Sequence, residues 1–208
     1  MSHNSEKVYF EQLARLLLET FLPNDYQGLT VSDKPDLLMG EDHGIEVTRA
    51  VYEGDGQASG IFQHIKMKSK EQVDSRHLQT FDKIGYEVIE LNGIISGYSP
   101  REATWVNNEL LKRTFERKAK IAKQYQSSIT DLFIFSPFSE WFEEYLIHDF
   151  MIWAEKHDGS AFSKIIVFEY PYIFLYSSKE STFSKISIDR EPYLQCCEIA
   201  REIVIKAK

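Results

Sequence analysis

The chain has 208 residues, of which 43% are hydrophobic, 13% aromatic and 27% charged, and this composition excludes a largely disordered protein and favours a globular domain with a substantial core. It carries 32 acidic and 24 basic side chains, a formal net charge of −8, so its surface as a whole repels nucleic acid and any phosphate-binding surface must be local. Because the sequence holds no long apolar run and no signal-peptide pattern, and its two cysteines, Cys196 and Cys197, are adjacent, we expect a cytoplasmic protein with neither a membrane-spanning segment nor a disulfide framework.

The first quarter of the chain predicts a helix followed by three short strands. Apolar residues from Phe10 to Phe21 recur at helical spacing, which indicates an amphipathic helix over residues 5–22. Three extended segments follow, at residues 29–32, 36–39 and 45–48, with a glycine-bounded turn at 40–44. We expect them to form an antiparallel meander.

Between about residues 50 and 106 the hydrophobic periodicity loosens, and we interpret this stretch as an insertion. Gly54, Gly56 and Gly60 indicate an irregular beginning. A polar helix is predicted over residues 62–70, and a strand over 86–91.

After the insertion, helices and strands alternate again. The strongest helical pattern covers residues 107–125 and leads into an apolar strand at 130–135, an order typical of a crossover into a buried sheet position. The remaining predicted elements are a helix at 140–156, strands at 164–170, 172–176 and 185–188, and a closing helix at 193–206. This order predicts a single α/β domain with a mixed central sheet over residues 1–208, in which the chain from about 137 is a C-terminal extension.

Asp36 and Glu46 are the candidate chemical centre of this domain. If the strands at 36–39 and 45–48 form a hairpin, the two carboxylates can approach each other. Such a pair supplies the oxygen ligands that Mg²⁺ or Mn²⁺ prefers, and the metal can activate water beside a phosphodiester. Because side chains alternate along a strand, Glu46 and Thr48 share one face of the sheet.

Pro35-Asp36, followed by Glu46-Val47-Thr48, resembles the motif of the PD-(D/E)xK nuclease superfamily, the restriction-endonuclease-like fold. The element order up to the strand at 130–135 is similar to that family's core of helix, three-stranded meander, helix and strand. The resemblance implies a Mg²⁺- or Mn²⁺-dependent endonuclease acting on DNA. It also implies that Asp36, Glu46 and the Val47 carbonyl are metal ligands.

One position departs from the family's motif, because Thr48 stands where the resemblance places a lysine. Threonine carries no positive charge, and two interpretations follow. Either activity is lost and the chain is a nuclease-like scaffold that binds a protein or nucleic-acid partner, or another lysine takes the role.

The helix predicted over residues 107–125 offers such a lysine. At about 100° per residue, Lys118 falls within its apolar stripe, which consists of Leu111, Phe115, Lys118, Ala122 and Tyr125. A lysine directed toward a sheet needs a partner, because an unpaired buried charge is costly, and Asp36 and Glu46 could be that partner. The alternative is that Lys118 extends past its neighbours to solvent.

The opposite side of the same helix is basic. It carries Lys112, Arg113, Arg117, Lys120 and Lys123. Such a stripe either lies along a phosphate backbone or is simply a solvated face.

A further carboxylate is implied on the first helix by families similar to this one. Glu11 borders the apolar side of that helix and Glu6 lies near its start, so periodicity does not choose between them. We favour Glu11, and a solvated position is the alternative for both.

The leading hypothesis from the sequence is therefore metal-dependent phosphodiester hydrolysis on nucleic acid, with DNA as the expected substrate. Asp36 and Glu46 would bind the metal, Lys118 would orient the attacking water, and Glu11 would support the metal site. A symmetric homodimer would bring two such sites to the two strands of a duplex.

Overall fold

The computed structural model describes residues 3–52, 54–101, 108–122, 129–136, 144–159 and 161–206. The chain divides into two compact units, one made of Met1–Ala50 with Asn108–Lys208 and the other of Val51–Asn107. The second unit occupies the stretch that the sequence indicates as an insertion. All the candidate site residues belong to the first unit.

The first unit is built on a seven-stranded sheet with the strand order β1-β2-β3-β6-β7-β8-β9. β3, β6 and β7 pair in parallel, and the outer neighbours pair antiparallel. The fold is therefore α/β with a mixed sheet, as the sequence predicts. The strands are β1 Thr30–Val31, β2 Leu37–Met39, β3 His43–Arg49, β6 Ile129–Phe135, β7 Lys164–Glu169, β8 Tyr172–Ser177 and β9 Thr182–Ser187.

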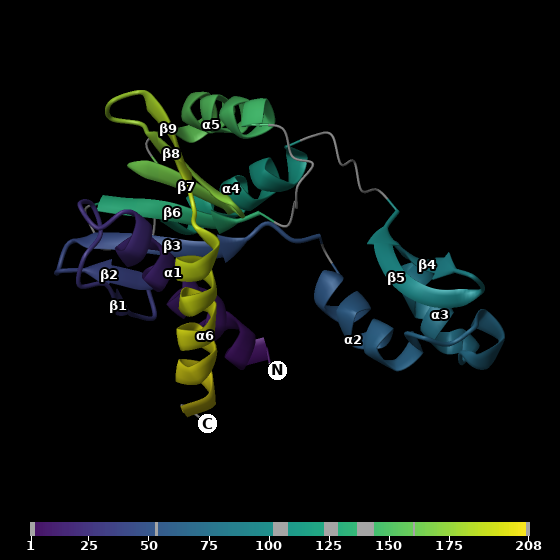
Figure 1. Ribbon diagram of the computed structural model, residues 1–208. Helices are drawn as coiled ribbons and strands as arrows, with labels where there is room; N and C mark the ends of the chain where they lie inside the picture. The colour runs from purple at the N-terminus through teal and green to yellow at the C-terminus, as the bar shows by residue number, and fades with distance from the viewer. Residues whose placement is uncertain are drawn as a thin grey trace. The chain divides into compact units, whose positions relative to one another are not determined.

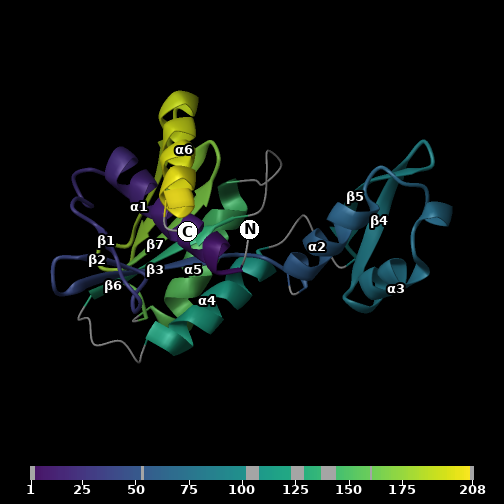
Figure 2. The same ribbon diagram turned by 90° about the horizontal axis from the view of Figure 1, so that it is seen from below.

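Helices cover both faces of this sheet (Figures 1 and 2). α1 (His3–Phe21) and α6 (Arg190–Lys206) lie side by side on one face, and α4 (Glu109–Ala122) and α5 (Glu144–Asp158) lie on the other. Strands β7–β9 continue the sheet beside β6, so the C-terminal part of the chain completes the core of the first unit.

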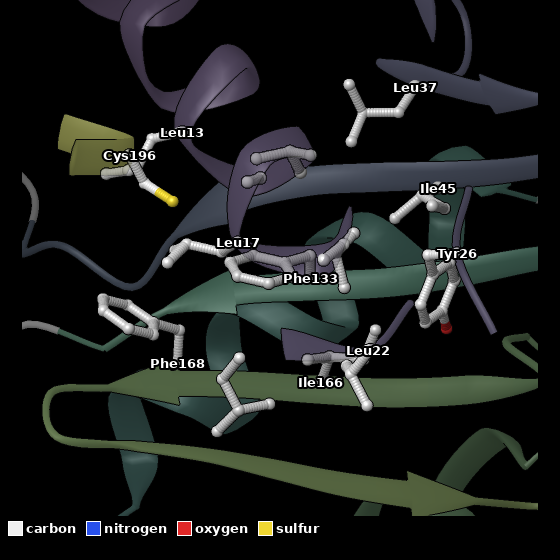
Figure 3. Close-up of a cluster of buried hydrophobic side chains, with 14 of the residues drawn as sticks. Leu13, Leu17, Leu22, Tyr26, Leu37, Ile45, Phe133, Ile166, Phe168 and Cys196 are labelled. Atoms are coloured by element: carbon white, nitrogen blue, oxygen red, sulfur yellow. The ribbon is translucent and has the colours of Figure 1, made fainter. Parts of the chain in front are cut away.

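The alternation of side chains along β3 sorts apolar residues from polar ones. Ile45 and Val47 face α1 and join its core, where Figure 3 shows Leu17, Ile45 and Phe133 together. Glu46 and Thr48 point to the opposite face, where side chains of α4 contact them. β3 thus presents its acidic residue to α4.

The second unit has its own small core. It contains α2 (Asp55–Ile65), a short 3₁₀ helix η1 (Lys70–Gln72), α3 (Ser75–Lys83) and the antiparallel pair β4 (Tyr86–Leu91) and β5 (Ile94–Pro100). Its buried residues are Ala58, Ile65, Phe81, Tyr86 and Ile95.

Several sequence predictions in the second unit are wrong. The helix predicted over residues 62–70 is α2, which begins at Asp55, ends at Ile65 and includes Gly56 and Gly60. Burial of Ala58 and Ile65 on one helical face outweighs the cost of about 1 kcal/mol that each interior glycine adds. α3 and β5 were not predicted; α3 has only nine residues, and Phe81 is its one buried residue.

The strand predicted over residues 86–91 is β4, with the same ends, and the remaining predicted elements are present with shifted ends. β3 already begins at His43, inside the predicted turn, and α6 begins at Arg190. Parts of the predicted segments, at residues 107, 123–125, 137 and 140–143, lie outside the described residues. No helix in the described part of the chain is long and apolar enough to cross a membrane.

Candidate active site

Asp36 is held by the main chain of β3. It lies directly before β2 and is buried, with 5% of its surface exposed. Strand pairing between β2 and β3 ends at Leu37↔Ile45, and beyond it the Val47 N–H donates to Asp36 Oδ2 at 2.9 Å. Since the N–H and C=O of one strand residue point to the same side, the Val47 carbonyl faces the same sheet edge as Asp36.

Glu46 meets Lys118 on the opposite face of β3. Glu46 is 4% exposed, and Lys118 Nζ donates a hydrogen bond and forms an ion pair with Glu46 Oε1. The Lys118 side chain is itself only 15% exposed. The stripe position of Lys118 on α4 therefore delivers its ammonium to the acidic strand residue and not to solvent.

Glu11 and an unpredicted lysine complete the cluster from α1. Glu11 is 5% exposed, and Lys7 lies one helical turn before it. Lys7 Nζ is 3.2 Å from Glu11 Oε1 and 3.5 Å from Asp36 Oδ1. Lys7 therefore bridges a carboxylate of α1 and the carboxylate before β2. Its four-residue spacing from Glu11 was the sequence signal that could have identified it.

Glu6, the alternative to Glu11, is engaged elsewhere. It accepts a hydrogen bond of 2.7 Å from Arg49 Nη1, and the Arg49 guanidinium lies 4.5 Å from the centre of the Phe10 ring. Of the two acidic candidates on α1, the structure thus brings Glu11 to Asp36.

The pKa values follow from burial and from these contacts. Burial raises the pKa of Asp36 and the charge of Glu11 adds to that effect, while the Val47 N–H, Lys118 and Lys7 act in the opposite direction. Burial lowers the pKa of Lys7, but Glu11 and Asp36 outweigh it and the net shift is upward. The charges of Glu11, Lys7 and Lys118 therefore act on Asp36, and those of Glu11 and Asp36 act on Lys7. Three carboxylates, those of Glu11, Asp36 and Glu46, are held by two ammonium groups.

The ligand atoms available in this cluster are of the type that a hard divalent cation binds. Asp36, Glu46 and the Val47 carbonyl offer oxygen ligands, which Mg²⁺ and Mn²⁺ accept together with several waters. In the described residues, no group of three or more His, Cys, Asp or Glu side chains converges on one point. A cation held here would therefore depend on the main-chain carbonyl and on water as well as on the carboxylates.

Thr48, at the position that lacks the expected lysine, is bound from the helix. Its Oγ1 accepts a hydrogen bond of 3.1 Å from Arg117 Nη2. The sequence places Arg117 on the basic, solvated side of α4, and its guanidinium instead folds back to β3.

A second buried polar cluster, which the sequence analysis missed, surrounds Asp131 on β6. Asp131 Oδ2 accepts hydrogen bonds from Tyr26 at 2.7 Å and pairs with His43 Nε2 at 2.8 Å, and Oδ1 accepts the Lys164 N–H at 3.0 Å. Asp131 is fully buried. An aspartate within an apolar strand was the available signal, and its full set of partners indicates a structural role.

Comparison with known proteins gives no relative. No model of a protein family, no curated protein and no solved structure matches the chain.

A hollow of about 300 Å³ lies in the second unit, lined by Leu78, Phe81 and Tyr86 among others, and it includes none of the candidate site residues.

Proposed function

We propose that the chain is a Mg²⁺- or Mn²⁺-dependent phosphodiesterase of nucleic acid, a DNA endonuclease with a core of the restriction-endonuclease type. The observation that carries the proposal is the ion pair between Lys118 of α4 and Glu46 of β3, next to the buried Asp36. A lysine on a helix here stands in for the strand lysine that Thr48 replaces.

The order of elements supports the same proposal. α1 precedes the meander β1–β2–β3, and α4 and β6 follow after the second unit. β6 lies beside β3 in parallel. This order, with one acidic residue directly before the second strand and one on the third, agrees with the core that the sequence resemblance implies.

Each residue of the cluster has a chemical role in this proposal. Asp36, Glu46 and the Val47 carbonyl would hold the cation, which when bound acts as a Lewis acid and lowers the pKa of a coordinated water. Lys118 holds the attacking water by a hydrogen bond and faces the negative charge that develops on the phosphate oxygens. Glu11, whose negative charge acts on Asp36, would support the metal site.

Metal binding tests the proposal directly. We expect Mn²⁺ titrated into the wild-type protein, with a short DNA duplex present, to give a binding isotherm in a calorimeter. Asp36→Asn should abolish it, because the amide oxygen still accepts the Val47 N–H but the negative charge is gone. Asp33→Asn, in the exposed part of the same loop, is the matched control and should bind as the wild type does.

A second function is favoured by one observation. Each of the three carboxylates already has a lysine within ion-pair distance, an arrangement that would also suit a scaffold that has lost catalysis and binds a protein or nucleic-acid partner. This alternative predicts no Mn²⁺ isotherm for the wild type, with or without DNA. An isotherm that Asp36→Asn leaves unchanged would contradict the proposed metal site as well.

A further inference from the structure

The contact between Arg117 and Thr48 joins α4 to the strand that carries Glu46. Arg117 Nη2 donates to Thr48 Oγ1 at 3.1 Å. Thr48 is 8% exposed and shares its sheet face with Glu46, two residues earlier on β3. Arg117 is exposed and directly precedes Lys118. The guanidinium therefore lies at the solvent side of the candidate site.

The partner of Arg117 distinguishes it from the other cations around β3. Lys7 contacts Glu11 and Asp36, Lys118 contacts Glu46, and Arg49 contacts Glu6. In the described part of the chain, the acceptor of Arg117 is a neutral hydroxyl. A guanidinium has five N–H donors in a rigid planar fork, so the bond to Thr48 orients the fork and leaves donors for an anion.

We propose that Arg117 is a phosphate-binding residue, which holds the non-bridging oxygens of a nucleic-acid phosphodiester while Thr48 orients its guanidinium. The planar fork matches two phosphate oxygens at once. The Arg117 guanidinium on α4 thus places a positive charge beside Thr48, the strand position at which the resemblance expects a lysine. The inference rests on the proposed function, since it names the group that receives the substrate phosphate beside Asp36 and Glu46.

Binding without cleavage tests the role. The probes are fluorescein-labelled DNA and RNA duplexes of the same sequence, titrated in Ca²⁺ and followed by fluorescence anisotropy at several salt concentrations. We expect Arg117→Gln to weaken binding about tenfold or more and to reduce the salt dependence by about one ion. Arg117→Lys should recover only part of the loss because it keeps the charge without the fork. The duplex that binds more tightly identifies the source of the phosphate.

Two further variants separate an oriented guanidinium from general positive charge. Arg113→Gln removes the exposed arginine one turn earlier on α4 and should change the affinity by less than about twofold. Thr48→Val keeps every charge and should weaken binding severalfold, without adding to the loss in Arg117→Gln. Equal losses for Arg113→Gln and Arg117→Gln, or additive losses for Thr48→Val and Arg117→Gln, would overturn the inference.

The outcome also separates this inference from the proposed function. Arg117→Gln should retain the Mn²⁺ isotherm of the wild type, because Arg117 holds no metal ligand. A wild-type protein that binds metal and duplex, with Arg117→Gln unimpaired, would overturn the phosphate-binding role alone. A wild-type protein that binds neither would overturn both.

Discussion

The ammonium of Lys118 lies against the carboxylate of Glu46, although 72 positions separate the two residues in the sequence. Both side chains are largely buried, with 15% and 5% of their surfaces exposed. Removing one charge of a buried pair is strongly destabilising, whereas removing both is often close to neutral. The pair therefore has a stability signature that can be measured apart from any activity.

We expect Lys118→Met to lower the free energy of unfolding by about 2–4 kcal/mol, because the buried Glu46 loses its ammonium partner. The double variant Glu46→Gln/Lys118→Met should recover most of that loss. Urea denaturation of the two single variants and the double variant measures the coupling. The same Lys118→Met protein should lose any Mn²⁺-dependent cleavage.

The matched control for that cycle is Lys120→Met, two residues along α4 and exposed. It should change the free energy of unfolding by less than about 0.5 kcal/mol. Strictly additive effects of Glu46→Gln and Lys118→Met would contradict a buried, coupled pair.

Lys7 should compete with a metal ion for the carboxylates. Its ammonium lies 3.5 Å from Asp36 Oδ1, and its side chain is 52% exposed, so it can leave the site at small cost. Removing this positive charge in Lys7→Met should tighten Mn²⁺ binding about three- to tenfold, since an opposing charge at this range is worth about 1 kcal/mol. Calorimetric titration measures the change.

Lys34→Met is the control for general charge, because Lys34 is exposed two residues before Asp36 in the same loop. Its Mn²⁺ affinity should match the wild type. Unchanged or weaker binding by Lys7→Met would show that Lys7 supports the metal site instead of competing for it.

The positions of Asp36, Glu46 and Lys118 could be predicted because each depends on a local rule. A hairpin places Asp36 near the next strand, alternation with period two turns Glu46 to one face, and the 3.6-residue helical period turns Lys118 toward the sheet. The core order of the first unit follows from similarly strong patterns of apolar residues.

The contacts of Lys7 and Arg117 could not be predicted in the same way. Both belong to polar helix faces, where solvent is the expected surrounding. Their long side chains fold back because a neighbouring element offers an acceptor, Asp36 in one case and Thr48 in the other. Such contacts depend on the packing distance between elements, which sequence periodicity does not specify. The same limit applies to α2, whose glycines concealed a helix that tertiary burial stabilises.

For Asp131, to which we assign a structural role, we predict an effect on protein stability. In Asp131→Ala, the Tyr26 hydroxyl, His43 and the Lys164 N–H lose their shared acceptor in a buried place, and the free energy of unfolding should fall by about 3–5 kcal/mol. Asp25→Ala, which removes an exposed partner of the Lys164 ammonium, should cost less than about 1 kcal/mol. Chemical denaturation compares the two. A stable Asp131→Ala protein would contradict the structural role of this cluster.

Glu169, at the end of β7, should make the stability of the fold depend on pH. It is 6% exposed, and its Oε2 has no hydrogen-bond partner among the described residues. Burial raises its pKa from 4.5 to about 7, while a hydrogen bond with Ser136 acts in the opposite direction. The folded state therefore binds this proton more tightly than the unfolded state. The resulting stabilisation is fully present below pH 4.5 and is lost as the pH rises through about 7. In Glu169→Gln the side chain cannot ionise, so the variant escapes this loss. The free energy of unfolding of the variant minus that of the wild type should therefore be about 1–3 kcal/mol larger at about pH 8 than at about pH 5.

Urea denaturation across this pH range tests the difference. The control is Glu198→Gln, at an exposed position on α6, which should follow the wild type. Parallel pH profiles for Glu169→Gln and the wild type would show that the Glu169 carboxyl keeps an ordinary pKa in the folded protein.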